Sequence, residues 1–220
     1  MSLKFLLFVS FLLIIVTQSF SQRNYNEYNR IGITGGITFF DITTSDLKTK
    51  QGQGLAGGFT ARGSFRNKFD LIYGIGFYGT KVEILAKKEI ASTETEYVNY
   101  AINSVQIKIL GSYNIVKHHL SLEFGPVLNV NSKLKLDSDQ FEDHILDGYS
   151  FLKAKEIQDI SPVNFHLLGG LTAGLKSFRL SVQYQYGVTN MLNKLNSNNL
   201  ENTDFKGNSS TLIVSAVVYI

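Results

Sequence analysis

The chain contains no cysteine, and this absence excludes several kinds of chemistry at once. It rules out disulfides, thiol nucleophiles, thiolate zinc sites and a lipid-modified cysteine behind an export signal. Tryptophan is also absent, so an aromatic belt at a membrane interface would consist of phenylalanine and tyrosine. A formal charge of +3 on 220 residues is too small to indicate a nucleic-acid-binding protein, so no nucleic acid is expected as a partner.

Long hydrophobic runs are equally scarce, and the one that exists lies at the N-terminus. Residues 5–16 are apolar apart from one serine, follow the basic Lys4, and precede small serines at the two positions that a signal peptidase reads. About twelve apolar residues are fewer than the roughly 20 of a spanning helix. The sequence therefore predicts a signal peptide over residues 1–21, cleavage before Gln22 and a short segment over residues 22–29.

Beyond this segment, bulky apolar residues alternate with polar or small ones in about eight stretches, each near the length of a tilted transmembrane strand. The expected strands are Arg30–Phe40, Gly54–Phe65, Asp70–Val82, Tyr100–Tyr113, Leu120–Asn131, Val163–Leu175, Phe178–Thr189 and Ser210–Ile220. Open sheet edges cannot be satisfied in hydrocarbon, so a chain of this kind must close in a membrane. We therefore predict an all-β fold: a single antiparallel up-and-down transmembrane β-barrel of about eight strands over residues 30–220.

The connections between these strands alternate in length. The short ones are 66–69, 114–119 and 176–177, and the long ones are 41–53, 83–99, 132–162 and 190–209. Outer-membrane barrels show this pattern, with short turns and both termini in the periplasm and long polar loops outside. The Asn-rich residues 193–208 suggest a mobile loop, and the loop 132–162 is the expected place for binding an external partner.

The two faces of the strands differ in a way that favours a membrane barrel over a soluble, lipocalin-like barrel with an apolar calyx. One face is large and apolar, whereas the other carries small residues and charges, which suit a narrow polar lumen. The expected lumen glycines are Gly58, Gly74, Gly76, Gly170 and Gly174. The predicted lumen polar network is Arg62, Lys108, Glu123 and Arg179, with the charges paired because unpaired buried charges are costly. An interfacial aromatic girdle is expected from Phe65, Phe69, Tyr113 and Phe178 at the short-turn end.

Motifs that carry chemistry are weak. Residues 52–57 match the dinucleotide fingerprint in letters, but they close a loop and enter a strand instead of opening a helix. An EF-hand pattern fails in the third long loop. The histidines are expected as solvated turn residues (His118, His119), a lumen residue (His166) and a loop residue able to reach a lipid headgroup (His144). No catalytic residue, cofactor site or metal site is predicted, because no histidine stands in a set with a nucleophile and an orienting partner.

Four runs of sequence resemble a known family. They are Ser104–Tyr113, Leu120–Leu128, which contains Gly125-Pro126, Gly169–Gly174, and Val182–Asn190, which ends Tyr-Gly-Val-Thr-Asn. In order and spacing the chain resembles the PorT-like outer-membrane β-barrel family. The resemblance implies an outer-membrane barrel of about eight strands, with some relatives linked to protein secretion and no catalytic motif to carry over. One departure is the end of the chain, Tyr219-Ile220, where such barrels often finish on an aromatic residue.

These observations predict a non-enzymatic outer-membrane protein with a side-chain-filled lumen and long external loops. Its expected role lies in envelope structure, surface binding or a secretion apparatus. The expected partners are outer-membrane lipid and envelope or secretion-system proteins. The alternative is a small barrel enzyme acting on lipid or peptide at the surface, which would require His144 or His166 beside a Ser, Asp or Glu in a cleft near the outer leaflet.

Overall fold

The structure, a computed structural model of the chain, describes residues 28–90 and 92–220. The predicted signal peptide, residues 1–21, and nearly all of the segment 22–29 lie outside the described residues. The long strands are β1 (Asn29–Thr43), β2 (Thr49–Arg66), β3 (Phe69–Lys87), β4 (Thr95–Val116), β5 (Leu120–Asn131), β8 (Val163–Gly174), β9 (Phe178–Gly187) and β10 (Asn208–Tyr219). The loop between β5 and β8 adds β6 (Lys135–Leu136), β7 (Ile145–Leu146) and the 3₁₀ helices η1 (Asp139–Phe141) and η2 (Ala154–Ile157), and η3 (Asn193–Ser197) precedes β10. Among the described helices, none is long and apolar enough to cross a membrane.

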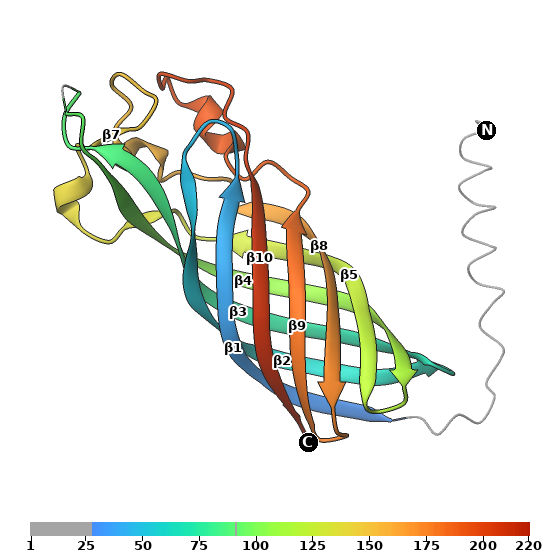
Figure 1. Cartoon of the computed structure of the whole chain (residues 1–220). Helices are drawn as coiled ribbons and strands as arrows, with labels where there is room; N and C mark the ends of the chain where they lie inside the picture. Colours follow the sequence, from blue (N-terminus) through green and yellow to red (C-terminus); the bar gives the residue numbers. More distant parts are fainter. Residues whose placement is uncertain (1–27, 91) are drawn as a thin grey trace, which may run out of the picture.

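The eight long strands form one closed barrel. Each pairs antiparallel with the next along the chain, and β1 closes the ring by pairing with β10 from Gly32↔Tyr219 to Thr43↔Asn208. Closure gives the backbone N–H and C=O groups of every strand a hydrogen-bond partner, which an open sheet in hydrocarbon cannot provide at its edges. Figure 1 shows the strands tilted around the barrel, with the long connections at one end and the C-terminus at the other. The predicted single antiparallel barrel of about eight strands is confirmed.

The turns at the C-terminal end of the barrel are tight. Only Asn67 and Lys68 separate β2 from β3, and three residues separate β4 from β5 and β8 from β9. Asn67 (φ 48°) and His118 (φ 66°) supply the left-handed backbone that the first two turns need, and both residue types tolerate it better than most. The short turns lie close to where the sequence predicts them.

The Gly125-Pro126 pair in β5 interrupts the ladder between β4 and β5. Proline has no N–H to donate, and the register passes from Lys108↔Val127 to Gly111↔Phe124 around it. Gly125 adopts φ +159°, and a Cβ at this position would lie 2.3 Å from the carbonyl oxygen of Ile109. Only glycine fits so close a backbone approach, which explains why these two residues occur together in a barrel strand.

The middle of the barrel is apolar on its outside. Exposed side chains here come from every long strand and include Ile33, Phe59, Tyr73, Ile75, Phe77, Ile107, Ile109, Phe124, Leu167, Leu171, Val182, Tyr184 and Val214. Water would penalise so large a continuous apolar surface, whereas lipid would not. Phe65, Phe69 and Phe178 are exposed at the short-turn end, where the rings of Phe69 and Tyr113 lie 5.2 Å apart. These four residues therefore occupy the level at which an interfacial girdle is expected.

Two of the predicted long loops, 41–53 and 83–99, are wrong, because strands fill most of both. β1 and β2 leave only residues 44–48 between them, and β3 and β4 leave only residues 88–94. Along β3 the outward face changes from Tyr73 and Phe77 to Lys81, while the inward face changes from glycine to Val82 and Ile84, both fully buried. The strands therefore continue past the apolar band into water, where the apolar side must face inward.

The Asn-rich residues 193–208, predicted to form a mobile loop, have many side-chain contacts to the backbone in the structure. The asparagines there fix the backbone: Asn190 Oδ1 accepts from the N–H groups of Leu192 and Gly207, at 3.0 and 2.9 Å. Asn196 Oδ1 accepts from the N–H of Phe205 at 2.6 Å, and its Nδ2 donates back to the Phe205 carbonyl at 3.1 Å. Asparagine favours such local side-chain to backbone bonds, so the composition marks a structured loop.

Candidate functional site: the filled lumen and the cap over its mouth

Arg62 on β2 is the centre of a buried polar network near the short-turn end of the lumen. Its Nε donates to Asp70 Oδ2 on β3 at 2.8 Å, and its Nη1 donates to Glu123 Oε1 on β5 at 3.3 Å. Its Nη2 donates to the hydroxyls of Ser112 and Ser121, the latter at 2.9 Å. The Arg62 and Asp70 side chains are both 3% exposed. A single guanidinium therefore joins four neighbouring strands through its fixed fork of donors.

Arg179 on β9 reaches the same network from the far wall. Its Nη2 donates to Ser121 Oγ at 2.8 Å and to the Thr172 carbonyl at 3.0 Å. Gln183, four residues further along β9, donates to Glu123 Oε2 at 2.9 Å. The structure thus brings Arg62, Glu123 and Arg179 into one network, with Arg179 linked through Ser121.

Asp70 is a network member that the sequence prediction omits. It stands at the start of β3 and shares the inward parity of Ile72 and Gly74, which was the available signal. Its carboxylate also accepts from the Tyr28 hydroxyl at 2.5 Å, which ties the start of the described chain to the short-turn end of the barrel. Arg62 and Tyr28 together account for the burial of this acid.

Lys108 on β4 lies apart from the hydrogen-bonded network. Its side chain faces the lumen and is buried, but in the described part of the chain no hydrogen bond or ion pair is recorded for its ammonium group. A cavity of about 20 Å³ lies between Lys108, Glu123, Thr60 and neighbouring polar residues. That volume accommodates one water molecule, which can connect the ammonium and the carboxylate without a direct contact.

The upper lumen is filled by amides and hydroxyls. Gln185 donates to Gln106 Oε1 across the barrel at 3.0 Å, and Ser104 donates to Asn131 Oδ1 at 2.8 Å. His166 lies where the sequence places it, in the lumen, with its Nε2 3.1 Å from Ser209 Oγ. Gln106 and Gln185 span the lumen, and the cavities between the described lumen side chains are only about 20 and 10 Å³.

Above the lumen, the loops and strand extensions pack into an apolar core that we call the cap. Its buried members are Phe40, Ile42, Leu47, Val82, Ile84, Ala86, Val98, Tyr100, Ile102, Leu134, Leu136, Leu146, Leu152, Ala154, Ile157, Ile160, Met191, Leu192, Leu195 and Phe205. They come from the ends of β1, β3 and β4, from the short connection between β1 and β2, and from the two long connections, β5–β8 and β9–β10. Figure 1 shows these segments folded over one end of the barrel. The sequence analysis missed this cap because it treated the loops as polar.

Ion pairs tie the loops of the cap to one another. Asp147 pairs with Lys48 at 2.6 Å and with Lys87 at 3.2 Å, which ties the β5–β8 loop to the β1–β2 connection and to the end of β3. Asp159 pairs with Lys133 at 3.2 Å and with Lys194 at 3.0 Å, which connects the β5–β8 loop to the β9–β10 loop. The loops therefore form one ordered platform instead of four independent segments.

A carboxylate also anchors one loop through its backbone. Glu201 accepts from the N–H groups of Ser150, Phe151 and Leu152, at distances between 2.8 and 3.0 Å. Three N–H donors on one carboxylate form a strong, charge-assisted contact. This contact holds the tip of the loop 132–162 against the loop before β10.

His144 belongs to this cap, and the expectation that it reaches a lipid headgroup is wrong. Its side chain is buried, its Nε2 lies 2.9 Å from Glu96 Oε1, and its ring packs edge-on against Phe141 at 5.1 Å. Hydrogen bonding to Glu96 and packing in the cap take it away from the barrel wall. His144 and His166 therefore serve separate contacts, one in the cap and one in the lumen.

Acid is expected to loosen the cap. Hydrogen bonds from Lys48 and Lys87 lower the pKa of Asp147 from its ordinary 3.8, and those from Lys194 and Lys133 do the same for Asp159. A lowered folded pKa means that the stabilisation is complete above pH 3.8 and is lost as the pH falls through the lowered value. Hydrogen-exchange protection of the amides of Leu134 and Met191 should therefore fall as the pH drops below 3.8, by less in Asp147→Asn than in the unmodified protein. An identical fall in both proteins would contradict this prediction.

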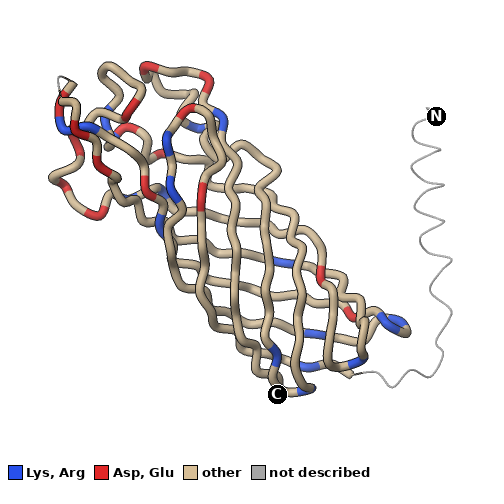
Figure 2. The backbone as a smooth tube through the Cα atoms, viewed as in Figure 1, with Lys and Arg blue, Asp and Glu red and all other residues tan. Residues whose placement is uncertain are grey.

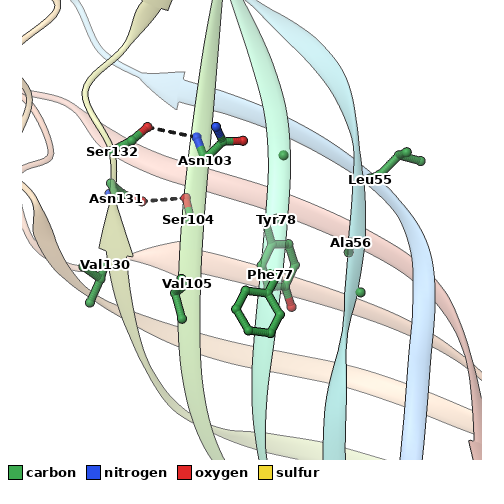
Figure 3. Close-up of a pocket in the computed structure, with 12 residues that line it drawn as sticks. Leu55, Ala56, Phe77, Tyr78, Asn103, Ser104, Val105, Val130, Asn131 and Ser132 are labelled. Carbon is green, nitrogen blue, oxygen red and sulfur yellow. Dashed lines mark hydrogen bonds between the residues drawn. The ribbon is translucent and has the colours of Figure 1, made fainter.

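The outer wall carries a groove of about 690 Å³ over β2 to β5, and a second, almost wholly apolar one of about 520 Å³ over β1 to β4. Figure 3 shows Leu55, Phe77, Val105 and Val130 on the surface of the first groove, beside the small residues that deepen it. At its upper edge the Asn103 N–H donates to Ser132 Oγ at 3.0 Å. This first groove lies where the apolar band gives way to polar residues. Among the described residues that line it, the hydroxyls of Tyr78, Ser104 and Ser132 have no histidine, lysine or carboxylate beside them.

The closed ring, the apolar outer band and the polar, side-chain-filled lumen define the class of membrane-spanning β-barrels. Comparison with known families identifies it further. Residues 18–193 match the sequence profile of the outer membrane protein beta-barrel domain. The chain belongs to this family of outer-membrane β-barrel proteins. A comparison with curated protein sequences finds no match.

Several solved structures are similar to this chain, and the likeness to the first of them supports the fold. Neisserial surface protein A, from Neisseria, has a TM-score of 0.50 and 12% identity, over 86% of this chain and 96% of that one. Ail of Yersinia pestis, in complex with the heparin analogue sucrose octasulfate, has a TM-score of 0.45 and 14% identity, over 87% and 99%. OprG of Pseudomonas aeruginosa has a TM-score of 0.46 and 10% identity, over 88% and 97%. At these identities the likeness concerns the fold alone.

Proposed function

We propose that this protein is a non-conducting, non-enzymatic outer-membrane barrel whose ordered cap presents a surface for envelope structure, binding or a secretion apparatus. The observation that carries the proposal is the double closure of the barrel. Polar side chains fill the lumen from the Arg62 network up to Gln106 and Gln185, and the apolar cap covers the mouth. A barrel closed in this way is suited to contact molecules at its surface and unsuited to diffusion.

The finer assignment to the PorT-like family is part of this proposal. Its support is the set of sequence runs that includes Gly125-Pro126 and the end of β9, Tyr186-Gly187, together with the family membership of the chain. A role beside secretion proteins would use the cap or the short-turn end as the contact surface. Outer-membrane lipid surrounds the apolar band in either case.

The proposal includes the route to the membrane and the orientation in it. Residues 1–21 would be removed as a signal peptide before Gln22, residues 22–29 would lead into β1, and residues 30–220 would form the barrel domain. The short turns and the C-terminus would face the periplasm, with the cap outside. N-terminal sequencing of the protein from isolated outer membranes tests the cleavage position.

The alternative, a barrel enzyme, is not favoured by the histidine contacts. His166 lies within hydrogen-bonding distance of Ser209, but both side chains are buried in the lumen, at 2% and 1% exposure. His144 contacts Glu96 in the cap, with no hydroxyl nucleophile bonded to it among the described residues. A catalytic set needs a nucleophile, a base and room for a substrate in one place.

Planar bilayer recording tests the closure directly. The refolded protein should insert without giving steady ion conductance, because the lumen holds paired charges and a water-sized cavity in place of a channel. A refolded porin prepared in the same detergent serves as the positive control. A reproducible single-channel conductance from the heat-modifiable, folded form would contradict the proposal.

A further inference from the structure

The two ends of the barrel carry opposite charge. The looped end, residues 41–50, 81–96, 133–159 and 194–206, holds eleven Lys and fifteen Asp or Glu. At the short-turn end, Arg66, Lys68, Lys117 and Lys176 are exposed, and we call these four the cationic rim. Figure 2 shows Asp and Glu gathered at the looped end and Lys and Arg at the turns of the opposite end. The acids nearest the rim, Asp70 and Glu123, are buried in the lumen and bonded to Arg62.

The lysines of the two ends also differ in their partners. Nine of the eleven lysines at the looped end form ion pairs, namely Lys48, Lys50, Lys81, Lys87, Lys133, Lys153, Lys155, Lys194 and Lys206. Within residues 28–90 and 92–220, the cationic rim takes part in no recorded ion pair. Burial, together with the charges of Lys176, Arg30 and Lys117, holds the pKa of His118 below its ordinary 6.5. The rim is therefore a positively charged surface that no carboxylate of the described residues neutralises through an ion pair.

The cationic rim lies directly beside exposed aromatic rings. Arg66, Asn67, Lys68, Phe69 and Tyr113 line a hollow of about 400 Å³. The apolar wall continues from Phe69 along β3 through Leu71 and Tyr73, which are exposed on the same face. Two cations next to two rings, at the edge of an apolar wall, match a ligand with an anionic head and hydrocarbon chains.

We infer that the cationic rim binds anionic glycerophospholipids of the leaflet at its end of the barrel, and that the hollow holds one headgroup. Its phosphate would lie at Arg66 and Lys68, with the acyl chains running along Phe69 and Leu71. This inference rests on the orientation given under the proposed function, in which the short turns face the periplasmic, phospholipid leaflet. Zwitterionic lipids carry no net charge to balance the rim, so the preference should be for lipids of net negative charge.

The absence of tryptophan permits a direct test. Tyr113→Trp places the sole tryptophan of the chain at the hollow, and Phe65→Trp places it on the neighbouring β2 as a second reporter. The protein is reconstituted in phosphatidylcholine with small amounts of brominated phosphatidylglycerol or brominated phosphatidylcholine, and fluorescence quenching gives their relative binding. Each basic residue near a membrane surface contributes about fivefold, so the phosphatidylglycerol preference should reach about 20-fold from Arg66 and Lys68.

Matched variants separate this site from general attraction. Arg66→Gln with Lys68→Gln should reduce the preference to within about twofold of unity. Lys88→Gln with Lys135→Gln removes the two unpaired lysines of the looped end and should leave the preference unchanged. Equal quenching by both lipids, or a preference that survives the rim substitutions, would overturn the inference.

A labelling experiment distinguishes failure of the orientation from failure of lipid binding. Because the chain has no cysteine, Ser177→Cys at a short turn and Ser197→Cys in the cap each give a single thiol. A membrane-impermeant maleimide should label Ser197→Cys on intact cells and Ser177→Cys only after the outer membrane is permeabilised. Labelling of Ser177→Cys on intact cells would overturn the assignment to the periplasmic leaflet, whatever the quenching shows.

Discussion

Replacing Arg62 with alanine is expected to lower the free energy of unfolding of the barrel by about 3–5 kcal/mol. The guanidinium is the shared partner of Asp70 and Glu123, and without it two carboxylates stay buried with too few donors. Lys108 cannot take over, since it lies at the cavity and not within the network. The measurement is urea unfolding of the refolded protein in vesicles, followed by the gel shift between folded and unfolded bands.

Three further variants show whether the effect comes from the buried charges. Arg66→Ala removes the same residue type from the exposed rim and should change stability by less than about 0.5 kcal/mol. Arg62→Lys keeps the charge but loses the fork of donors, so an intermediate loss is expected. Arg62→Met combined with Glu123→Gln removes opposite charges together and should cost less than the sum of the two single changes. A stability of Arg62→Ala within about 1 kcal/mol of the unmodified protein would contradict the role of the network.

Replacing Phe205 with aspartate is expected to open the cap while the barrel stays folded. Phe205 is fully buried, its ring lies 6.1 Å from that of Tyr149, and its backbone is held by Asn190 and Asn196. Loss of a buried phenylalanine costs about 3–5 kcal/mol, and an unpaired carboxylate adds to that cost. The barrel ladder from β1 to β10 does not depend on this side chain.

Limited trypsin digestion measures this opening. Cleavage in the loops 132–162 and 188–207 should accelerate at least about 100-fold in Phe205→Asp, since about 3 kcal/mol changes the open population by that factor. The heat-modifiable gel shift should remain. Phe151→Asp is the matched control, because Phe151 lies in the same cap but is 63% exposed. A cap that stays resistant to trypsin in Phe205→Asp would show that the loops do not depend on the apolar core.

The barrel itself could be predicted because alternation along a strand reports the environment of its two faces. In β9, Leu180, Val182 and Tyr184 point outward and Arg179 and Gln183 point inward, as the period of two requires. The alternation in β5 predicts in the same way that Glu123 faces the lumen. The same alternation along β3 places Asp70 on the inward face, although the sequence prediction of the lumen network omitted it.

The cap could not be predicted in the same way, because its members come from segments far apart in the chain. Leu134, Met191 and Phe205 show no regular spacing, and each becomes a core residue only when the loops meet over the mouth of the barrel. The sequence also alternates in the parts of β3 and β4 nearest the cap. There, however, the apolar residues face inward and the polar ones outward, because the strands have left the lipid. For the same reason, the regions 41–53 and 83–99, predicted as loops, are mostly extensions of strands β1 to β4.

The sequence by itself therefore determined the barrel, its two faces and the inward position of its charges, since these depend on local periodicity. The tertiary structure decided which charges meet, as with Arg62 and Asp70 against Lys108, because the stagger of the strands sets the level of each side chain in the lumen. It also decided that the long loops form one core, because the apolar residues at the mouth can leave water only by packing on one another.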